Sequence, residues 1–189
     1  DKNKLNHKNL KNISSNLIFS NSGEAILINK DFTKGILLRG YNTKDFLKLE
    51  IAQQKNFIGV NNNLIENNII IGKQLSINLN LKIGDKIMIM SPKGIETIIG
   101  SLPQQQPFIV SSIFDSGLVE FDQNIAFINI KTLENFFGLN NIDRNLEIYL
   151  MDPSNIEMQK KIIEKIFDKN LIYTWADMNR SLFSALKVE

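Results

Sequence analysis

The residue types that carry most enzyme chemistry are scarce in this sequence. His7 is the only histidine and cysteine does not occur, which excludes zinc-thiolate sites, cysteine nucleophiles and metal sites built on a histidine pair. A Ser-His-Asp site would have to use His7, yet the G-x-S-x-G motif that presents the serine of many hydrolases is missing. We therefore interpret His7 as a solvated surface residue. Because of these missing residues, a hydrolase of unknown type ranks last among three functional hypotheses.

Three carboxylates lie close together in the stretch FDSGLVEFD. Asp115, Glu120 and Asp122 could act as an acid and base pair or bind Ca²⁺, but the Asp-x-Asp-x-Asp-Gly spacing of a calcium loop is missing. Because Asp and Gly favour turns, we interpret this stretch as a turn. The Gly and Lys residues of GKQL and LKIGDK do not form the G-x-x-x-x-G-K-[ST] phosphate loop. The sequence therefore predicts no catalytic residues, no cofactor and no metal site.

One stretch fits none of the catalytic, metal or phosphate sites considered so far. It is TIIGSLPQQQPFIV, which runs from Thr97 to Val110. The apolar flanks, Ile98-Ile99 and Phe108–Val110, predict two paired strands. The centre is much longer than the two-residue turn of a tight hairpin. It carries no charge, and Pro103 and Pro107 each fix φ and favour an extended preceding residue. An ordinary long surface loop is the alternative interpretation.

Composition narrows the class of protein. A chain of 189 residues with 43% hydrophobic residues can form one domain or two small ones with a sizeable core. Charge is balanced, and the one basic cluster, DKNKLNHKNLK, has no aromatic residues, so we expect no nucleic acid partner. No apolar run reaches 18 residues and no signal peptide opens the chain. The abrupt start at Asp1 and end at SALKVE suggest a soluble segment of a longer protein.

Periodicity predicts the elements that must hold these residues. Strands are expected at residues 24–32, 34–41, 86–90, 124–130, 145–152 and 170–175, and helices at residues 5–13, 43–54, 73–79, 131–138, 153–167 and 177–189. Gly138 is expected to end one helix. Ser154 with Glu157 forms the pattern of a capping box, and Asp177 is expected to cap the last helix. Strand-helix-strand patterns at both chain ends surround a β-rich segment from Leu64 to Gly117, so we expect an α/β domain interrupted by a β insert.

Three stretches together resemble one protein family: IIIGKQLSINLNLKIGDKIMIMSP, GSLPQQQPFIVSSIFDSGLVEFDQNIAFI and WADMNRSLFSALKVE. They are similar to the periplasmic domain of lipoprotein-releasing ABC transporter permeases, the LolC/LolE type, within a wider group that shares a MacB-like periplasmic core. The G-K-x-L…L-x-x-G-D-K block is common to the wider group. The helix LFSALKVE and the G-x-[IL]-P element at Gly100–Pro103 narrow the match. The resemblance covers about residues 23–189.

The resemblance implies an α+β fold on the periplasmic face of the bacterial inner membrane. An α/β Porter-like domain would be formed by both chain ends, residues 1–52 and 126–189, the second part leading to a transmembrane helix. A β-rich Sabre-like insert would cover residues 53–125. It would carry a protruding β-hairpin, called the Hook in this family, at about residues 97–110. The first periplasmic strand of the family would precede residue 1.

The resemblance also implies a function. The domain would be a non-catalytic part of a permease that releases lipoproteins, with ATP hydrolysis in a separate ATPase subunit and with either a second permease subunit or a homodimer partner. The Hook would recruit the periplasmic lipoprotein chaperone of LolA type through its tip, formed by Gly100, Ser101, Leu102, Pro103, Gln104, Gln105, Gln106 and Pro107. An uncharged, stiff tip suits insertion, because burying an unpaired charge is costly and a stiff segment loses little entropy on docking. The alternative is the periplasmic domain of a MacB-like efflux exporter that docks an adaptor protein and has no need of this tip.

Overall fold

The structure is a computed structural model that describes residues 10, 12–30, 32–53, 57–59, 64–92, 95–97, 100–167 and 170–178. The chain forms two compact units. The larger unit is Ile18–Glu147, and the smaller unit combines Asp1–Leu17 with Ile148–Glu189. Strands β1 (Ser14–Asn29) and β9 (Asn145–Leu150) contribute residues to both.

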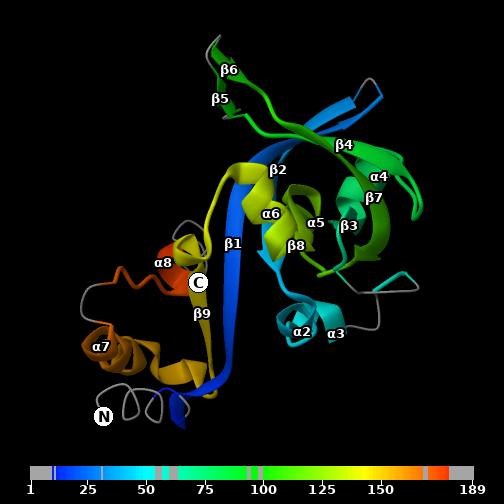
Figure 1. The fold of residues 1–189 in the computed structure, drawn as a ribbon. Helices are drawn as coiled ribbons and strands as arrows, with labels where there is room; N and C mark the ends of the chain where they lie inside the picture. The colour runs from blue at the N-terminus through cyan, green and yellow to red at the C-terminus, as the bar shows by residue number, and fades with distance from the viewer. Residues whose placement is uncertain are drawn as a thin grey trace. The chain divides into compact units, whose positions relative to one another are not determined.

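Six strands of the larger unit form a closed ring (Figure 1). In ring order they are β1, β2 (Phe32–Tyr41), β8 (Ile125–Asn129), β3 (Asn68–Gly72), β7 (Gln105–Phe114) and β4 (Lys86–Met90). The ring closes because β1 pairs antiparallel with two strands, with β2 over residues 20–29 and with β4 over residues 26–28. The pairs β2–β8 and β3–β7 are parallel. Strand β9 extends the sheet beside β1.

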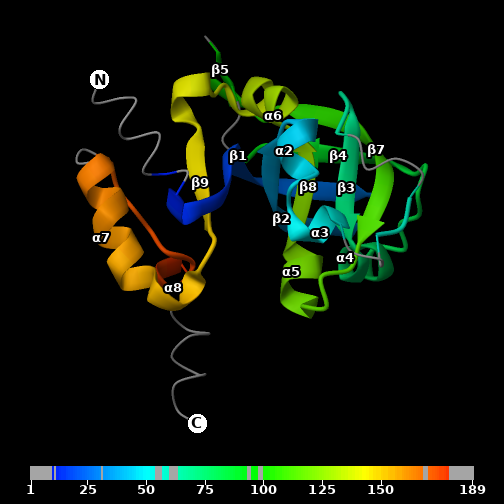
Figure 2. The same ribbon diagram turned by 90° about the horizontal axis from the view of Figure 1, so that it is seen from below.

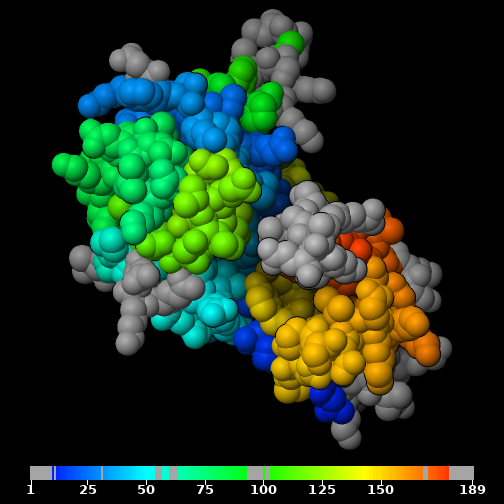
Figure 3. All heavy atoms as spheres, turned by 180° about the vertical axis from the view of Figure 1, so that it is seen from behind, coloured from blue at the N-terminus to red at the C-terminus, as the bar shows by residue number. Residues whose placement is uncertain are grey.

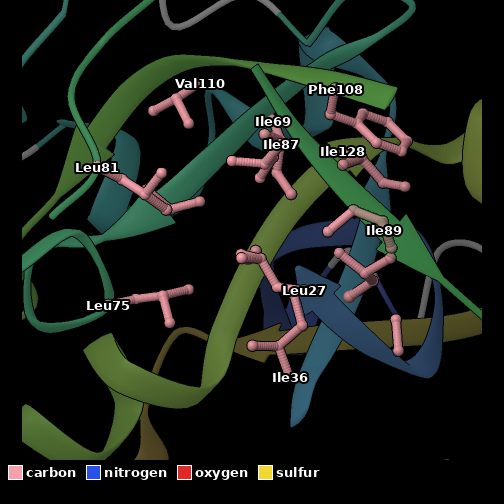
Figure 4. Packing of buried hydrophobic residues seen from close by; sticks show 14 of the residues in the cluster. Leu27, Ile36, Ile69, Leu75, Leu81, Ile87, Ile89, Phe108, Val110 and Ile128 are labelled. Carbon is pink, nitrogen blue, oxygen red and sulfur yellow. The ribbon is translucent and has the colours of Figure 1, made fainter. Parts of the chain in front are cut away.

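The main hydrophobic core lies inside this ring, where side chains from opposite strands meet (Figure 4). It contains Leu27, Leu38, Ile69, Ile87 and Phe108, one from each of five strands, each at most 2% exposed. Burying a side chain of this size contributes about 1.5–3 kcal/mol. The ring therefore has the packing of a small closed barrel, and its strands hold one another in a fixed register.

A second core lies on the outside of the ring, under two short helices, α2 (Thr43–Phe46) and α3 (Glu50–Gln53) (Figure 2). Phe46 packs against Tyr41 and Phe127 of the sheet. The single helix predicted for residues 43–54 is therefore divided. It starts where expected, because the side chain of Asn42 accepts the Asp45 N–H at 2.8 Å, and it breaks where Lys48 and Leu49 make tighter turn bonds to Asp45 and Phe46.

Three further helices belong to the larger unit, α4 (Lys73–Asn78), α5 (Val119–Asn124) and α6 (Ile130–Phe137). The first two lie side by side on its surface (Figure 3). Gly138 ends α6 in the left-handed conformation, with φ of 65°, which confirms its predicted role. Gly72 lies where α5 approaches the end of β3 most closely, since a Cβ there would be 2.0 Å from the carbonyl oxygen of Asp122.

Two ion pairs fasten the segment that leads into β9. Arg144, just after the 3₁₀ turn η1 (Asn141–Asp143), donates two hydrogen bonds to the carboxylate of Glu134 in α6, at 2.6 and 2.8 Å. This bidentate contact lowers the pKa of Glu134. Glu147 in β9 accepts hydrogen bonds from Arg39 at 2.6 Å, from Tyr41 at 3.0 Å and from Ser20. One carboxylate thus joins β9 to both β1 and β2.

The smaller unit contains the 3₁₀ turn η2 (Pro153–Asn155), α7 (Ile156–Ile166) and α8 (Trp175–Met178). The predicted capping box is wrong, because the carboxylate of Asp152 takes both the N–H and the hydroxyl of Ser154 and begins η2 instead. Helix α7 then starts at Ile156 without a side-chain cap.

The predicted strand at residues 170–175 is also wrong, since residues 170–174 pair with no strand among those described. Thr174 caps α8 instead. Its hydroxyl accepts the Asp177 N–H at 3.0 Å, while the Asp177 carboxylate accepts the Thr174 N–H at 2.9 Å, which is a reciprocal capping box. Asp177 therefore supports the cap rather than forming it, and it also accepts a hydrogen bond from Lys160 at 2.8 Å.

Several sequence predictions fall outside the described residues. They are His7, most of the helix at residues 5–13, and the terminal helix beyond Met178. The boundaries of the Porter and Sabre parts at residues 53 and 125 stay predictions, and the two compact units divide elsewhere, at residues 17/18 and 147/148. Within the described ranges, no helix combines the length and the apolar character that crossing a membrane requires.

The close approach at Gly72 makes a testable prediction. Replacing Gly72 by Ala should lower the free energy of unfolding by about 2 kcal/mol, because the new methyl group overlaps backbone and forces the sheet or α5 to move. The matched control is Gly35→Ala in β2, where a Cβ meets nothing within 4 Å and the change should stay within about 0.5 kcal/mol. Urea unfolding of the three proteins measures both. Equal losses for the two variants would contradict the packing described at Gly72.

A second prediction concerns how the free energy of unfolding changes as the pH falls. The pKa of Glu134 is lowered from 4.5 in the folded chain, so the Arg144 pair stabilises the fold above that value and stops doing so as the pH falls through the lower folded pKa. The variant Glu134→Gln lacks this charge at every pH. The difference in free energy of unfolding between wild type and Glu134→Gln should therefore shrink between pH 6 and pH 3, as measured by urea unfolding. A difference that stays constant would mean that the pair contributes nothing through its charge.

Candidate interaction site

A short two-stranded hairpin projects from the ring beyond the ends of β4 and β7 (Figure 1). Its arms are β5 (Ile95–Thr97) and β6 (Gly100–Leu102), which pair antiparallel with Thr97 opposite Gly100. Gly100 has φ of 118°, a conformation that only glycine adopts without strain. Gly100 therefore begins the returning arm of the hairpin.

This register corrects the predicted hairpin. We expected Phe108–Val110 to form one arm, but Phe108 lies opposite Ile87 of β4, and Val110 lies opposite Ile69 of β3. The physical reason is burial, because Phe108 and Val110 fill the core of the ring. Ile98 and Ile99, the other predicted arm, lie outside the described residues. The signal was the length of the run, because PFIVSSIF continues well past Val110 and fits one long strand, β7, better than a short hairpin arm.

The eight predicted docking residues consequently divide among three parts of the structure. Gly100, Ser101 and Leu102 form β6, Pro103 and Gln104 connect the strands, and Gln105, Gln106 and Pro107 begin β7. They remain one continuous segment. Its first part belongs to the projecting hairpin and its last part to the rim of the ring.

Three contacts fasten this segment to the ring. The backbone N–H of Ser91 donates to the carbonyl oxygen of Gln104 at 2.9 Å, so the pairing of β4 with β7 continues one step beyond the strands. The side-chain amide of Gln105 lies 3.6 Å from the sulfur of Met90, and that of Gln106 donates to Asn67 at 3.1 Å. Sequence reasoning did not single out Met90 or Asn67, because both anchor the segment only through a register that pairs distant residues.

Pro107 fits within β7 although it has no N–H to donate. It lies opposite Met88. The residue pairs on both sides of it are the ones that exchange hydrogen bonds between β7 and β4, as the alternation that starts at the Ser91–Gln104 bond shows. In antiparallel pairing a residue between two hydrogen-bonded pairs points its N–H to the opposite edge of its own strand. Pairing with β3 on that edge begins only at Ile109, so the missing donor breaks no ladder bond. Pro107 therefore stiffens the start of β7 without cost to the sheet.

The chemistry that this segment offers is that of a binding surface. It carries no charged residue, and Gly100, Pro103, Gln105 and Pro107 are exposed. Its groups can make apolar contacts, backbone hydrogen bonds and amide hydrogen bonds. None of them titrates, so contacts made by the segment itself should not depend on pH.

The acidic stretch that could have formed a second site is only partly the turn interpreted from the sequence, because residues 115–118 form a turn while Glu120 and Asp122 lie in α5. Asp122 is 3% exposed, and its carboxylate accepts the N–H and the hydroxyl of Ser116. Asp115 accepts a hydrogen bond from Lys73 at 2.8 Å, which lowers the pKa of this carboxyl group. Glu120 is exposed. Over the described part of the chain, no three His, Cys, Asp or Glu residues are arranged to hold a metal ion.

Sequence comparison finds relatives, although no protein-family model matches the chain. It is 25% identical over 156 residues to the lipoprotein-releasing system transmembrane protein LolC of Xylella fastidiosa (strain Temecula1), which covers 81% of this chain and 38% of that protein. It is 26% identical over 172 residues to LolC of Neisseria meningitidis serogroup B, which covers 89% and 41%. The chain thus spans about two fifths of the length of these relatives.

Solved structures share the fold. The extracellular domain of the noncanonic ABC-type transporter YknZ from Gram-positive bacteria has a TM-score of 0.50 at 13% identity, over 88% of this chain and 84% of that one. The periplasmic region of MacB from Actinobacillus actinomycetemcomitans also has a TM-score of 0.50, at 12% identity, over 95% and 81%. These comparisons confirm the resemblance predicted from the sequence: the chain is similar in sequence to LolC proteins of lipoprotein-releasing systems, and it has the mixed α+β fold of the periplasmic domains of MacB-type ABC permeases.

Proposed function

We propose that this chain is the periplasmic domain of an inner-membrane ABC transporter permease that releases lipoproteins, and that Gly100–Pro107 recruits the periplasmic lipoprotein chaperone of LolA type. The observation that carries the proposal is the position of this segment. An uncharged stretch with two prolines runs from a projecting hairpin to the rim of the ring, with Pro103 and Pro107 exposed. The similarity to LolC proteins supports the lipoprotein-releasing system as its setting.

The geometry suits reversible binding of a chaperone, which must dissociate again after it has bound. The hairpin stands clear of the ring, while the Ser91–Gln104 bond and the Gln106–Asn67 contact fix its base. A fixed base reduces the entropy lost on docking. An eight-residue segment alone covers much less than the roughly 800 Å² per partner of a standard interface. We therefore expect a modest, reversible affinity.

The remaining parts of the proposal concern the whole permease. In this account the β5–β6 hairpin with the segment that follows it is the Hook, carried by a Sabre-like part at residues 53–125. Residues 1–52 and 126–189 form the Porter-like part. The domain is not an enzyme, and ATP hydrolysis belongs to a separate ATPase subunit. The lipoprotein cargo is a further partner, as is a second permease subunit or a homodimer partner.

The alternative is a MacB-like efflux exporter domain that docks an adaptor protein. The fold shared with the periplasmic region of MacB favours it as much as it favours a lipoprotein permease. The sequence similarity to LolC proteins and the exposed Gly100–Pro107 segment favour the lipoprotein permease. Binding of the chaperone distinguishes the two functions.

The substitution Pro103→Arg tests the docking role. It adds a charge that must lose water on docking and removes the fixed φ, so we expect at least a tenfold loss of chaperone affinity, about 1.4 kcal/mol. The fold should be unchanged because Pro103 is exposed in the connection between β6 and β7. Calorimetric titration of a purified LolA-type chaperone from the same bacterium measures the affinity, and circular dichroism checks the fold.

The matched control is Ile142→Arg in the turn η1, where the side chain is 86% exposed. It adds the same charge at another exposed site of the larger unit and should leave the affinity unchanged. If wild type, Pro103→Arg and Ile142→Arg bind the chaperone equally while all three are folded, Gly100–Pro107 is not the docking segment. If the wild-type chain binds an efflux adaptor and no chaperone, the exporter function replaces the proposed one.

A further inference from the structure

The turn that follows β7 presents apolar side chains to solvent. Leu118 and Val119, where α5 begins, are 59% and 60% exposed, and Gly117 before them is exposed as well. The next apolar residue of α5 behaves differently, because Phe121 packs against the second core. Single exposed apolar residues are ordinary on a protein surface, whereas grouped ones mark candidate interaction sites.

Hydrogen bonds fix the backbone of this turn. The carboxylate of the buried Asp122 accepts the N–H and the hydroxyl of Ser116. The carboxylate of Asp115 accepts the N–H of Gly117 at 3.1 Å. Leu118 donates its N–H to the hydroxyl of Ser116 at 3.1 Å, and its carbonyl oxygen accepts the N–H of Asp122 at 2.9 Å. Because the backbone is fixed on both sides of Leu118, the exposed apolar pair would lose little entropy when a partner binds.

Helix α4 adds a third apolar side chain beside the turn. The ammonium group of Lys73, at the start of α4, lies 2.8 Å from the carboxylate of Asp115, so this face of α4 borders the turn. Ile77 follows one helical turn later on the same face and is 61% exposed. We name Ile77, Leu118 and Val119 the α4–α5 patch. All three residues belong to the larger unit.

The α4–α5 patch lies away from the proposed docking segment. Strand β7 runs from Gln105, beside the β5–β6 hairpin, to Phe114, which directly precedes the turn. A strand of this length rises about 30 Å. A chaperone that docks on Gly100–Pro107 therefore leaves the patch uncovered, and the patch needs a different partner.

We infer that the α4–α5 patch contacts the same patch on a second copy of this chain, an inference that rests on the permease pairing in the proposed function. In a two-fold contact each residue of one copy that meets a residue of the other does so twice. The charges beside the patch fit such a contact, because they are of opposite sign: Lys73 on α4 and Glu120 on α5, both exposed. Lys73 of each copy can therefore approach Glu120 of the other.

The small area of the patch favours a second copy over a free soluble partner. Full burial of an aliphatic side chain removes about 60–120 Å² from water, so the three side chains at their observed exposure present roughly 100–200 Å². A stable interface between free partners needs about 800 Å² on each side. Two permease subunits in one membrane assembly are linked, and linkage raises their effective concentration to about a millimolar. A contact of this size can form under that condition.

Disulfide trapping tests this contact, because the 189-residue chain has no cysteine of its own. The axis of a two-fold contact passes through the patch, so the variant Leu118→Cys brings two thiols close together. At a protein concentration of about 0.5 mM under a mild oxidant, this variant should form a disulfide-linked dimer at least tenfold faster than the control Ile142→Cys. Ile142 belongs to the same unit and is 86% exposed, so random collisions would favour the control. Circular dichroism checks that both variants are folded.

A second pair of substitutions tests the match of charges. Adding Glu120→Lys to the Leu118→Cys variant places a lysine opposite Lys73 of the other copy, and it should slow the crosslink about threefold. The matched control adds Glu157→Lys, an equal change of charge at an exposed position of the smaller unit. This control should leave the crosslinking rate unchanged.

The outcomes separate this inference from the chaperone docking proposed above. If Leu118→Cys and Ile142→Cys crosslink at equal rates while the chaperone still binds the wild-type chain, the inference fails and the docking role stands. An effect of Glu120→Lys no larger than that of Glu157→Lys would also overturn the two-fold contact. If Leu118→Cys crosslinks tenfold faster but the chaperone does not bind, the docking role fails and the contact between copies stands.

Discussion

The double pairing of β1 is the constraint on which the rest of the larger unit depends. Over residues 26–28, β1 bonds to β2 on one edge and to β4 on the other, so the sheet closes and no strand of the ring can slip by one residue. A slip would turn Leu27 and Ile89 out of the core and bring their polar or partly exposed neighbours in. Closure of the ring also fixes where β4 and β7 end, and the β5–β6 hairpin lies beyond those two ends.

The same constraint links fold to function. Because β7 joins the ring from Gln105 onward, the proposed docking segment has a rigid end at the rim and a projecting end at the hairpin. A docking element held in this way loses little freedom when a partner binds. Glu147 and the Glu134–Arg144 pair add polar contacts that hold the start of β9 to the unit.

Local sequence patterns predicted much of the fold. Short apolar runs located β4 and β8, alternation of apolar and polar residues located β9, and a glycine marked the end of α6 at Gly138. Predictions failed where a distant or competing contact decided the outcome. Asp152 took the hydroxyl of Ser154 away from the predicted capping box. Phe108 pairs with Ile87 because its side chain is buried in the core of the closed ring. The hairpin therefore lies closer to the N-terminus of the chain than predicted. Sequence spacing carries no information about which strand lies opposite, so the docking residues were predicted as one tip although the structure divides them between a hairpin arm and a barrel strand.

The central claim is that the segment around Pro103 touches the lipoprotein chaperone during transport. Site-specific photocrosslinking in the full-length permease, embedded in its membrane, tests this most directly. A benzoylphenylalanine residue placed at position 103 should form a crosslink to the chaperone, because the site is exposed beside the projecting hairpin. The same residue placed at position 142, which is 86% exposed on the same unit, should form none. Crosslinking at position 142 with none at position 103 would contradict the account.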